Sequence, residues 1–429
     1  GGLEAPSAGR PAAPARDEAA AWAEQEAKRR RIEAACGAGS PEKGGSRFLP
    51  PRQARREPPR IGTFLVKASP QASSAYGGYR SSETFGLRNL GNTCYLNAVM
   101  QAFSSLREFV RDLGRMADSF PLCNDGGLYR CTVDILQQMS AAGPAVGPLS
   151  PTKLRDLVAA ASPTFRGNEQ QDAHEFFLEY LNQLHDELLG ARSSWLEADP
   201  GREADSPDVP ALATQAHLDS EVHKRLVCVS CRQTREVRER FHDFSLDFDA
   251  AGGPGERCSL DGMLASYFAP ETLEVACEKC GAPQARMEKT LALPPQTLVL
   301  HMKRFVPNLA LQRYDKRHQA VEAPLRLSLD RALGAPRLPA RPLAGGEGGE
   351  APEGAAPERW YGLRAVVAHD GATPYSGHYV CYASGEDGHW RLYDDSMVRD
   401  LGSGFDPRQE LGRKAYIFFY VAEGQPAEA

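Results

Sequence analysis

The sequence places a cysteine where thiol chemistry is favourable. Cys94 follows a polar, glycine-bearing loop that begins at Gly86, and it stands at the start of an amphipathic helix. Because the unpaired N–H groups and the dipole of a helix N-terminus stabilise anions, a thiolate nucleophile can form there near neutral pH. Asn89 could point its amide N–H at the oxyanion produced when such a thiolate attacks a carbonyl. A buried cysteine in a helix cap is the equally simple alternative for this segment.

A second segment supplies the other groups that thiol catalysis needs. His378 follows Ser-Gly where a strand is predicted to begin, and the next strand ends in Asp394 and Asp395. Catalysis by cysteine, histidine and an acid requires an imidazole that takes the thiol proton and a third group that fixes its tautomer. The two aspartates point to opposite sides if the strand continues, so only one can face the ring. The other could support the oxyanion or a water molecule. Three further histidines in predicted strands are interpreted as structural: His301, His369 and His389.

Two Cys-x2-Cys pairs form a candidate metal site. Cys228 and Cys231 make the first pair, and Cys277 and Cys280 make the second. Four thiolates are a closed tetrahedral ligand set for structural zinc, although the separation of the pairs exceeds that of a compact zinc ribbon. Reduced pairs that hold no metal are the alternative, and Cys258 between them is interpreted as a spare thiol.

An acidic pair marks the start of a second predicted helix. Large apolar residues recur at helical spacing from about Glu169 to Leu189, and Asp172 and Glu175 lie off that stripe. Residues three apart are neighbours on a helix, so these two acids could make a local acidic site. On this pattern alone a solvated acidic face is the simpler interpretation, and a binding site for a basic ligand is the alternative.

Length and composition limit the class of protein. The chain has 429 residues, of which 41% are hydrophobic and 25% charged, as in ordinary globular proteins. A formal net charge of −6 gives no global basic field for nucleic acid. No apolar run approaches the roughly 18 to 20 residues that span a bilayer, and no signal peptide is evident. Ten cysteines are too few for a disulfide scaffold in a chain of this length. These features predict a soluble protein of the reducing interior.

The chain is expected to hold one large domain between loose segments. Residues 1–84 and 422–429 are predicted to be disordered tails, and 334–358 a flexible linker, because they are rich in Pro, Ala, Gly and charged residues. The basic run at 28–31 fits either a nuclear-import signal or a solvated turn. Between the tails, a helical part that opens with one amphipathic helix from Leu96 to Leu113 precedes a series of strands, which predicts an α+β fold.

Taken together, these segments resemble the ubiquitin-specific protease family of deubiquitinases, which are papain-like cysteine peptidases. The resemblance extends from about Phe85 to Val421 and comprises four separated motifs in the family's order. They are the Cys box at Gly86 to Asn97, the helix that binds the ubiquitin tail at Asn168 to Phe177, the strand at His301 to Phe305, and the His box at Tyr375 to Tyr382 with Trp390 to Asp395.

The resemblance implies a fold likened to a hand, with a helical thumb, a β-rich palm and zinc-bearing β fingers within about 222–295. It also implies roles for the residues of the motifs. Cys94 would be the nucleophile, His378 the general base and later the general acid, and Asp394 the orienting acid. Asn89 would donate to the oxyanion. The metal ligands would be the four paired cysteines, and the contacts to the basic ubiquitin tail would come from Gln170, Asp172 and Glu175.

The expected function is therefore a thiol-dependent deubiquitinase that hydrolyses the isopeptide bond at the C-terminal glycine of ubiquitin. Its expected partners are ubiquitin and ubiquitylated proteins, without nucleic acid or membrane, and its expected state is a monomer in the nucleus, the cytoplasm or both. One structural zinc and no catalytic cofactor are expected. A non-catalytic ubiquitin-binding scaffold, and a protease acting on ordinary peptides or on another ubiquitin-like modifier, are the alternatives.

Overall fold

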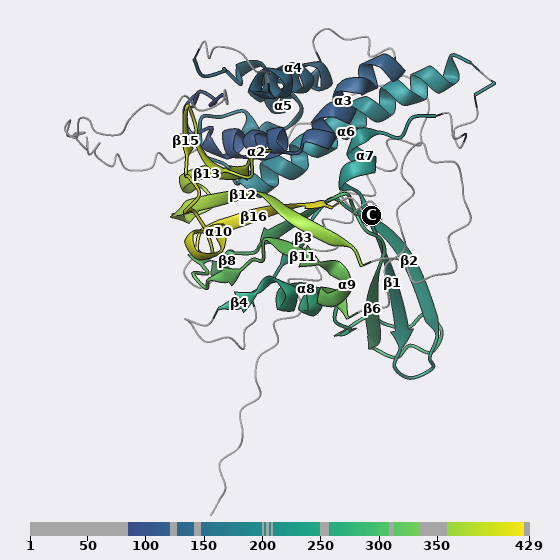
Figure 1. Cartoon of the computed structure of the whole chain (residues 1–429). Helices are drawn as coiled ribbons and strands as arrows, with labels where there is room; N and C mark the ends of the chain where they lie inside the picture. The colour runs from purple at the N-terminus through teal and green to yellow at the C-terminus, as the bar shows by residue number, and fades with distance from the viewer. Residues whose placement is uncertain are drawn as a thin grey trace, which may run out of the picture. The chain divides into compact units, whose positions relative to one another are not determined.

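The computed structural model describes residues 85–120, 127–140, 147–199, 201–202, 206, 209–248, 257–308, 313–334 and 358–423 (Figure 1). All of them belong to the second of two compact units, Gly78–Ala429. The predicted tail at 1–84, including its basic run, lies outside the described residues, as do nearly all of the predicted linker and residues 424–429.

Helices make up the first half of the described chain. They are α2 (Cys94–Ser105), α3 (Arg107–Ser119), α4 (Leu128–Ser140), α5 (Thr152–Ala161), α6 (Ala173–Glu197) and α7 (Ala213–Leu218), with a 3-10 turn at Pro163–Phe165. Aromatic side chains hold α2 against α6, since Phe103 stacks on Phe177 with ring centroids 5.7 Å apart and meets Tyr180 edge-on. This helical layer is the thumb of the hand-like fold.

A large sheet lies beneath the helices and forms the palm. Its strands are β3 (Phe244–Leu246), β7 (Thr297–Met302), β11 (Arg326–Ser328), β12 (Trp360–Thr373), β13 (Ser376–Ser384), β14 (Trp390–Asp394), β15 (Met397–Asp400) and β16 (Ala415–Ala422). The order is β15-β14-β13-β12-β16-β7-β3, with β11 on β12, and every pairing is antiparallel except that of β3 with β7.

Strand β16 explains why the sheet has a core on each face. Successive side chains of a strand point to opposite faces. Ile417 and Phe419 pack with the helical layer, whereas Phe418 and Tyr420 pack with α8 (Leu260–Phe268) and α9 (Leu329–Leu333). The sheet is thus the middle of three layers, and its strand ends meet the N-terminus of α2.

A separate antiparallel sheet forms the fingers, which extend away from the helices in Figure 1. Its strands are β1 (Ser220–Cys228), β2 (Thr234–Phe241), β5 (Glu271–Leu273) and β6 (Ala285–Leu293), in the order β2-β1-β6-β5. The remaining described elements are short: β4 (Cys258–Ser259) pairs with β10 (Val321–Glu322), β8 (Phe305–Asn308) pairs with β9 (Arg313–Lys316), and α10 is Pro407–Glu410. The predicted α+β fold of thumb, palm and fingers is confirmed.

The first predicted helix is two helices. A break at Leu106, with φ −85° and ψ 71°, separates α2 from α3, and the Leu106 N–H bonds to the carbonyl of Phe103. The hydroxyls of Ser104 and Ser105 donate to carbonyl oxygens three residues earlier, at 2.8 and 2.6 Å. Serine side chains that bond nearby backbone carbonyls compete with helix continuation, which explains the break inside an apolar stripe that looked continuous.

The second predicted helix is displaced along the sequence. It was expected from about Glu169 to Leu189, whereas α6 runs from Ala173 to Glu197. The start is later because Asp172 has an extended backbone, φ −72° and ψ 130°, and caps the helix. The end is later because Trp195 packs edge-on against Phe120, with ring centroids 5.5 Å apart.

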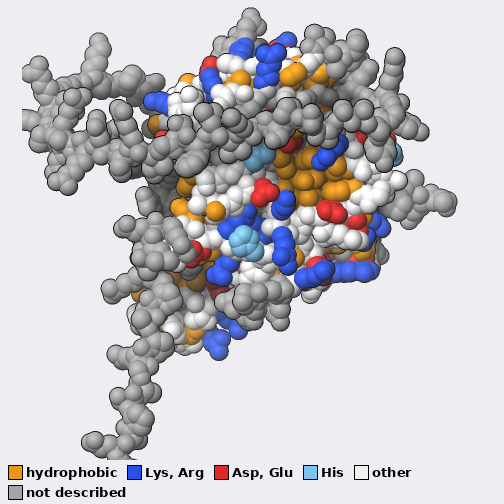
Figure 2. Space-filling view, turned by 90° about the vertical axis from the view of Figure 1, so that its left-hand side faces the viewer, with side chains coloured by type: hydrophobic (Ala, Val, Ile, Leu, Met, Phe, Trp, Pro, Cys, Tyr) orange, Lys and Arg blue, Asp and Glu red, His pale blue; other side chains and the backbone are white. Residues whose placement is uncertain are grey.

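The described helices include none that is long and apolar enough to cross a membrane. On the face seen in Figure 2, hydrophobic side chains gather in one area, and basic and acidic side chains lie beside it.

Candidate active site

The loop before α2 delivers Cys94 to the edge of the palm. Cys94 is the first residue of α2 and is only 2% exposed. The loop is fastened to the turn after β14, because the Leu87 N–H donates to the Asp395 carbonyl at 2.8 Å. Gly86 lies so close to this turn that a Cβ atom on it would stand 2.4 Å from the Ser396 carbonyl oxygen. Only glycine permits this approach.

The palm brings an imidazole and a carboxylate to the thiol. His378 lies on β13, and its Nε2 is 2.6 Å from Oδ1 of Asp394 at the end of β14. A hydrogen bond from the ring to the sulfur of Cys94 raises the pKa of His378 to about 9, against the effect of partial burial and with the help of Asp394. A thiol from the helical half of the chain therefore meets an imidazole and a carboxylate from two neighbouring strands of the palm.

Asp395 contacts different side chains from those that Asp394 contacts. Its backbone is left-handed, with φ 49°, a conformation that is uncommon for a residue other than glycine. Its carboxylate accepts hydrogen bonds from Nδ2 of Asn89 and from Nδ2 of Asn97, both at 2.8 Å. The candidate oxyanion donor Asn89 is thus bound to Asp395, and sequence reasoning missed the second partner, Asn97.

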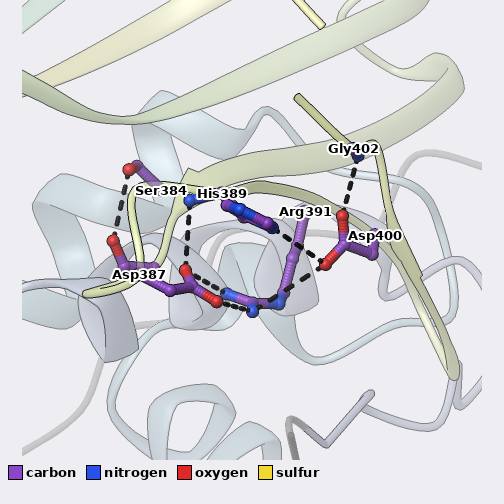
Figure 3. Close-up of polar contacts among 7 residues, drawn as sticks. Ser384, Asp387, His389, Arg391, Asp400 and Gly402 are labelled. Carbon is purple, nitrogen blue, oxygen red and sulfur yellow. Dashed lines mark hydrogen bonds and ion pairs between the residues drawn. The ribbon is translucent and has the colours of Figure 1, made fainter. Parts of the chain in front are cut away.

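Strand β14, which ends in Asp394 and is followed by Asp395, is fixed by a buried arginine. Arg391 is 5% exposed and forms an ion pair with Asp387 in the preceding turn, while its Nη2 lies 3.9 Å from Asp400 on β15 (Figure 3). Asp387 also accepts the backbone N–H of His389 at 3.1 Å, and Asp400 accepts that of Gly402 at 2.7 Å. These contacts hold the turn, β14 and β15 together.

The residues expected to meet the ubiquitin tail lie beside this site. Oδ1 of Asp172 accepts the N–H groups of His174 and Glu175, at 2.7 and 3.2 Å, and its Oδ2 accepts the hydroxyl of Tyr416 at 2.5 Å. Asp172 is therefore a helix cap as well as a link to β16, which corrects the expectation that it lies within the helix on one face with Glu175. An Asp directly before a helix with Glu three residues later is a recognised start signal, so the pattern could have revealed the cap.

An open groove of about 690 Å³ lies beside the loop before α2 and the start of β13. It is lined by Asn92, Glu169, Gln170, Gln171, Tyr375, Ser376 and Gly377. Nε2 of Gln170 is buried and has no hydrogen-bond partner among the described residues. A buried unpaired donor is costly, so Gln170 is suited to meet an acceptor on a ligand in this groove.

The four paired cysteines converge at the end of the fingers. Their sulfur atoms all lie within 4.8 Å of one another, and the Cys228–Cys280 and Cys231–Cys277 sulfurs are 3.7 and 3.6 Å apart. A zinc ion with four sulfurs at about 2.3 Å has sulfur–sulfur edges of about 3.8 Å, so the donor set fits this metal. The backbone N–H of Cys231 lowers the pKa of Cys228 to about 6, and that of Cys280 lowers the pKa of Cys277.

A thiol on a helix, an imidazole on a strand of the palm and a four-cysteine cluster on separate fingers are together typical of thiol-type deubiquitinating enzymes. Residues 85–420 match the sequence profile described as ubiquitin carboxyl-terminal hydrolase. The chain belongs to this family, whose ubiquitin-specific proteases are cysteine-type deubiquitinases.

Curated relatives agree with this assignment. The chain is 30% identical over 256 residues to human ubiquitin carboxyl-terminal hydrolase 37, which covers 58% of this chain and 26% of the human protein. The chain thus spans about a quarter of that relative's length. It is 29% identical over 370 residues to ubiquitin carboxyl-terminal hydrolase 4 of Arabidopsis thaliana, covering 79% and 93%, and 30% identical over 359 residues to ubiquitin carboxyl-terminal hydrolase 12 of Salmo salar, covering 78% and 89%.

Solved structures share the fold. The chain resembles the SAGA DUB module that contains Ubp8, solved with ubiquitin aldehyde, with a TM-score of 0.60 and 21% identity over 79% of this chain and 70% of that chain. The same module from yeast, with a substitution in Sgf73, gives a TM-score of 0.59 and 20% identity over 79% and 68%.

Proposed function

We propose that this chain is a thiol-dependent deubiquitinase that hydrolyses the isopeptide bond at the C-terminal glycine of ubiquitin. The observation that carries the proposal is the meeting of Cys94, His378 and Asp394 in one site of a family fold. Each member of the set has a chemical task, and a scaffold that only binds ubiquitin needs none of the three together.

The proposed reaction assigns one task to each group. The Cys94 thiolate attacks the carbonyl carbon of the terminal glycine, and the imidazolium of His378 protonates the departing amine. Water then hydrolyses the thioester, with His378 as the base. Asp394 fixes the direction of the ring, and Asn89 donates to the oxyanion while Asp395 holds its amide.

The groove supports a slender, basic substrate tail. Because Cys94 is 2% exposed, a chain without side chains at its end reaches the sulfur most easily, as glycines do. Gln170 supplies a donor for a backbone carbonyl of the tail, and Glu175 and Asp172 supply negative charge near basic residues that precede the glycines.

Covalent capture is the experiment that tests this function. A ubiquitin probe with an electrophile at its C-terminus should label Cys94 stoichiometrically, while matching probes of other ubiquitin-like modifiers should label it far more slowly. A chain that binds ubiquitin without being labelled is a scaffold. Equal labelling by all probes, or by a short peptide probe, would indicate a protease of different specificity.

The pKa of His378 predicts the alkaline limit of the reaction. Because this pKa is raised from 6.5 to about 9, protonation of His378 stabilises the folded state below about pH 6.5, and that contribution is lost as the pH rises through about 9. We expect kcat for a ubiquitin C-terminal fluorogenic amide to fall near pH 9, since the proton for the leaving amine is lost. In Asp394→Ala this fall in kcat should occur at a lower pH, because Asp394 no longer helps to raise the pKa of His378. A fall at the same or a higher pH would contradict the pairing of His378 with Asp394.

We also propose that the four cysteines of the fingers hold one structural zinc. Metal binding would then supply folding free energy, so loss of one ligand should loosen the fingers. We expect one zinc per chain by elemental analysis, and a lower melting temperature and weaker ubiquitin binding in Cys280→Ser. Cys258→Ser is the matched control, with zinc content unchanged. An active, purified chain without zinc would refute the site.

The charge of Glu175 tests the contact with the basic tail. Glu175 is exposed at the start of α6, and its removal leaves the cap made by Asp172 in place. We expect Glu175→Gln to raise KM about tenfold at low salt, with a smaller penalty at high salt because ions screen the pair. Asp172→Asn should lower the melting temperature as well. An unchanged KM in Glu175→Gln at low salt would leave this acid a solvated surface residue.

A further inference from the structure

Asn97 joins three parts of the active site. It lies one helical turn after the thiol on α2 and is 2% exposed. Its Nδ2 donates to Oδ1 of Asp395 at 2.8 Å and lies 3.3 and 3.4 Å from the carbonyl oxygens of Arg88 and Leu87. One amide group therefore connects the nucleophile's helix, the loop that carries Asn89 and the turn after β14.

The orientation of this amide follows from its surroundings. A rotated Asn97 would direct its oxygen at the Asp395 carboxylate and at two carbonyl oxygens, so acceptors would face acceptors. In the orientation observed, Oδ1 of Asn97 is buried and has no hydrogen-bond partner within the described part of the chain. An unpaired buried acceptor costs free energy, so what Asn97 contributes comes from the three acceptors that its Nδ2 meets.

Asp395 transmits the position of Asn97 to Asn89. Oδ1 of Asp395 meets Asn97, and Oδ2 meets Nδ2 of Asn89 at 2.8 Å. The left-handed backbone of Asp395 aims its carboxylate between the two amides. At its other end, Asn89 accepts the N–H groups of Gly91 and Thr93 through Oδ1, at 3.0 and 3.2 Å. Hydrogen bonds thus hold both the Oδ1 and the Nδ2 of Asn89. The N–H of Nδ2 that does not bond to Asp395 therefore has a fixed orientation.

We propose that Asn97 is a positioning residue for the reaction proposed above. It holds the Asp395 carboxylate, and through that carboxylate it fixes the N–H that Asn89 presents to the oxyanion. The inference rests on the proposed function, because the oxyanion belongs to the attack on the terminal glycine. None of the hydrogen bonds that the structure gives Asn97 reaches His378 or Asp394, so its effect is separate from the activation of the thiol.

A double-mutant cycle tests this inference. Asn97→Leu keeps the branched shape of the side chain, at a somewhat larger volume, and removes the donor. It should lower kcat for a ubiquitin C-terminal fluorogenic amide by roughly tenfold to a hundredfold, as expected for a misplaced oxyanion donor, with KM within about twofold. Alkylation of Cys94 by iodoacetamide should keep its rate. In an Asn89→Ala background the same substitution should change kcat by less than about twofold, because the group that it positions is gone.

Gln101 provides the matched control. It is a second buried amide on α2, and it donates to the Phe85 carbonyl at 2.9 Å. Gln101→Leu should lower the melting temperature about as much as Asn97→Leu but leave kcat near wild type. If Asn97→Leu does not fold, Asn97→Ala enters the same cycle.

The outcomes separate this inference from the proposed function. Full kcat in folded Asn97 variants, or an equal loss with and without Asn89, would overturn the positioning role while leaving the deubiquitinase proposal intact. A wild-type chain without turnover would remove both. A loss of Cys94 alkylation in Asn97→Leu would also overturn the inference, because it would show a general disturbance of the nucleophile's helix.

Discussion

Replacement of Cys94 by serine is expected to reduce turnover of a ubiquitin C-terminal amide to below about one part in 10⁴ of wild type, while ubiquitin binding stays nearly unchanged. The reason is that a serine hydroxyl keeps the shape of the site but is not ionised by a neighbouring imidazole near neutral pH. Steady-state kinetics and a binding titration measure the two quantities on the same preparation. His378→Ala should cause a loss of similar size, because both proton transfers depend on this ring.

Two matched controls separate this chemistry from damage to the fold. Cys381 lies on β13 near His378, is fully buried, and has its pKa raised by burial, so its thiol is inert. Cys381→Ala should therefore keep turnover. His301 is 8% exposed and stacks on His174 with ring centroids 3.6 Å apart, so His301→Ala should chiefly lower the melting temperature. Turnover near wild type in Cys94→Ser would exclude the thiol mechanism.

The sequence predicts those parts of the site that depend on local patterns. A glycine-bearing loop before an amphipathic helix indicated the place of Cys94, and Ser-Gly before a strand indicated that of His378. Both predictions need only helix and strand periodicity together with turn residues. The four paired cysteines are a pattern of the same kind, and their sulfur atoms do converge.

Such local patterns do not predict contacts between segments that are distant in the sequence. Asn97 and Asp395 are 298 positions apart, and their hydrogen bond requires both the close approach of the loop before α2 and a left-handed residue after β14. Neither follows from periodicity. The contact of Arg391 with Asp400 likewise depends on the register of β14 against β15, which alternation alone does not determine. The hydrophobic pattern locates the elements, and turn geometry decides which side chains meet.

Asp394→Ala is expected to lower kcat by a factor on the order of 10² or more, with the fold and the affinity for ubiquitin retained. The geometry supplies the reason. Nε2 of His378 is 2.6 Å from Asp394, and this contact helps to keep the ring charged while it fixes its direction. We therefore expect slower alkylation of Cys94 by iodoacetamide near pH 7 in this variant. Asn at this position could keep part of the hydrogen bond, so alanine is the cleaner change.

Asp395→Ala should differ from this result in the assay that reports the nucleophile alone. Asp395 bonds to the amides of Asn89 and Asn97, so its removal should lower kcat through the oxyanion donor and leave alkylation of Cys94 close to wild type. Asp394→Ala and Asp395→Ala would both reduce turnover, but only the first should slow the alkylation of Cys94, a reaction that forms no oxyanion. If Asp395→Ala slowed alkylation and Asp394→Ala did not, the orienting acid would be Asp395, and the short contact of His378 with Asp394 would have only a structural role.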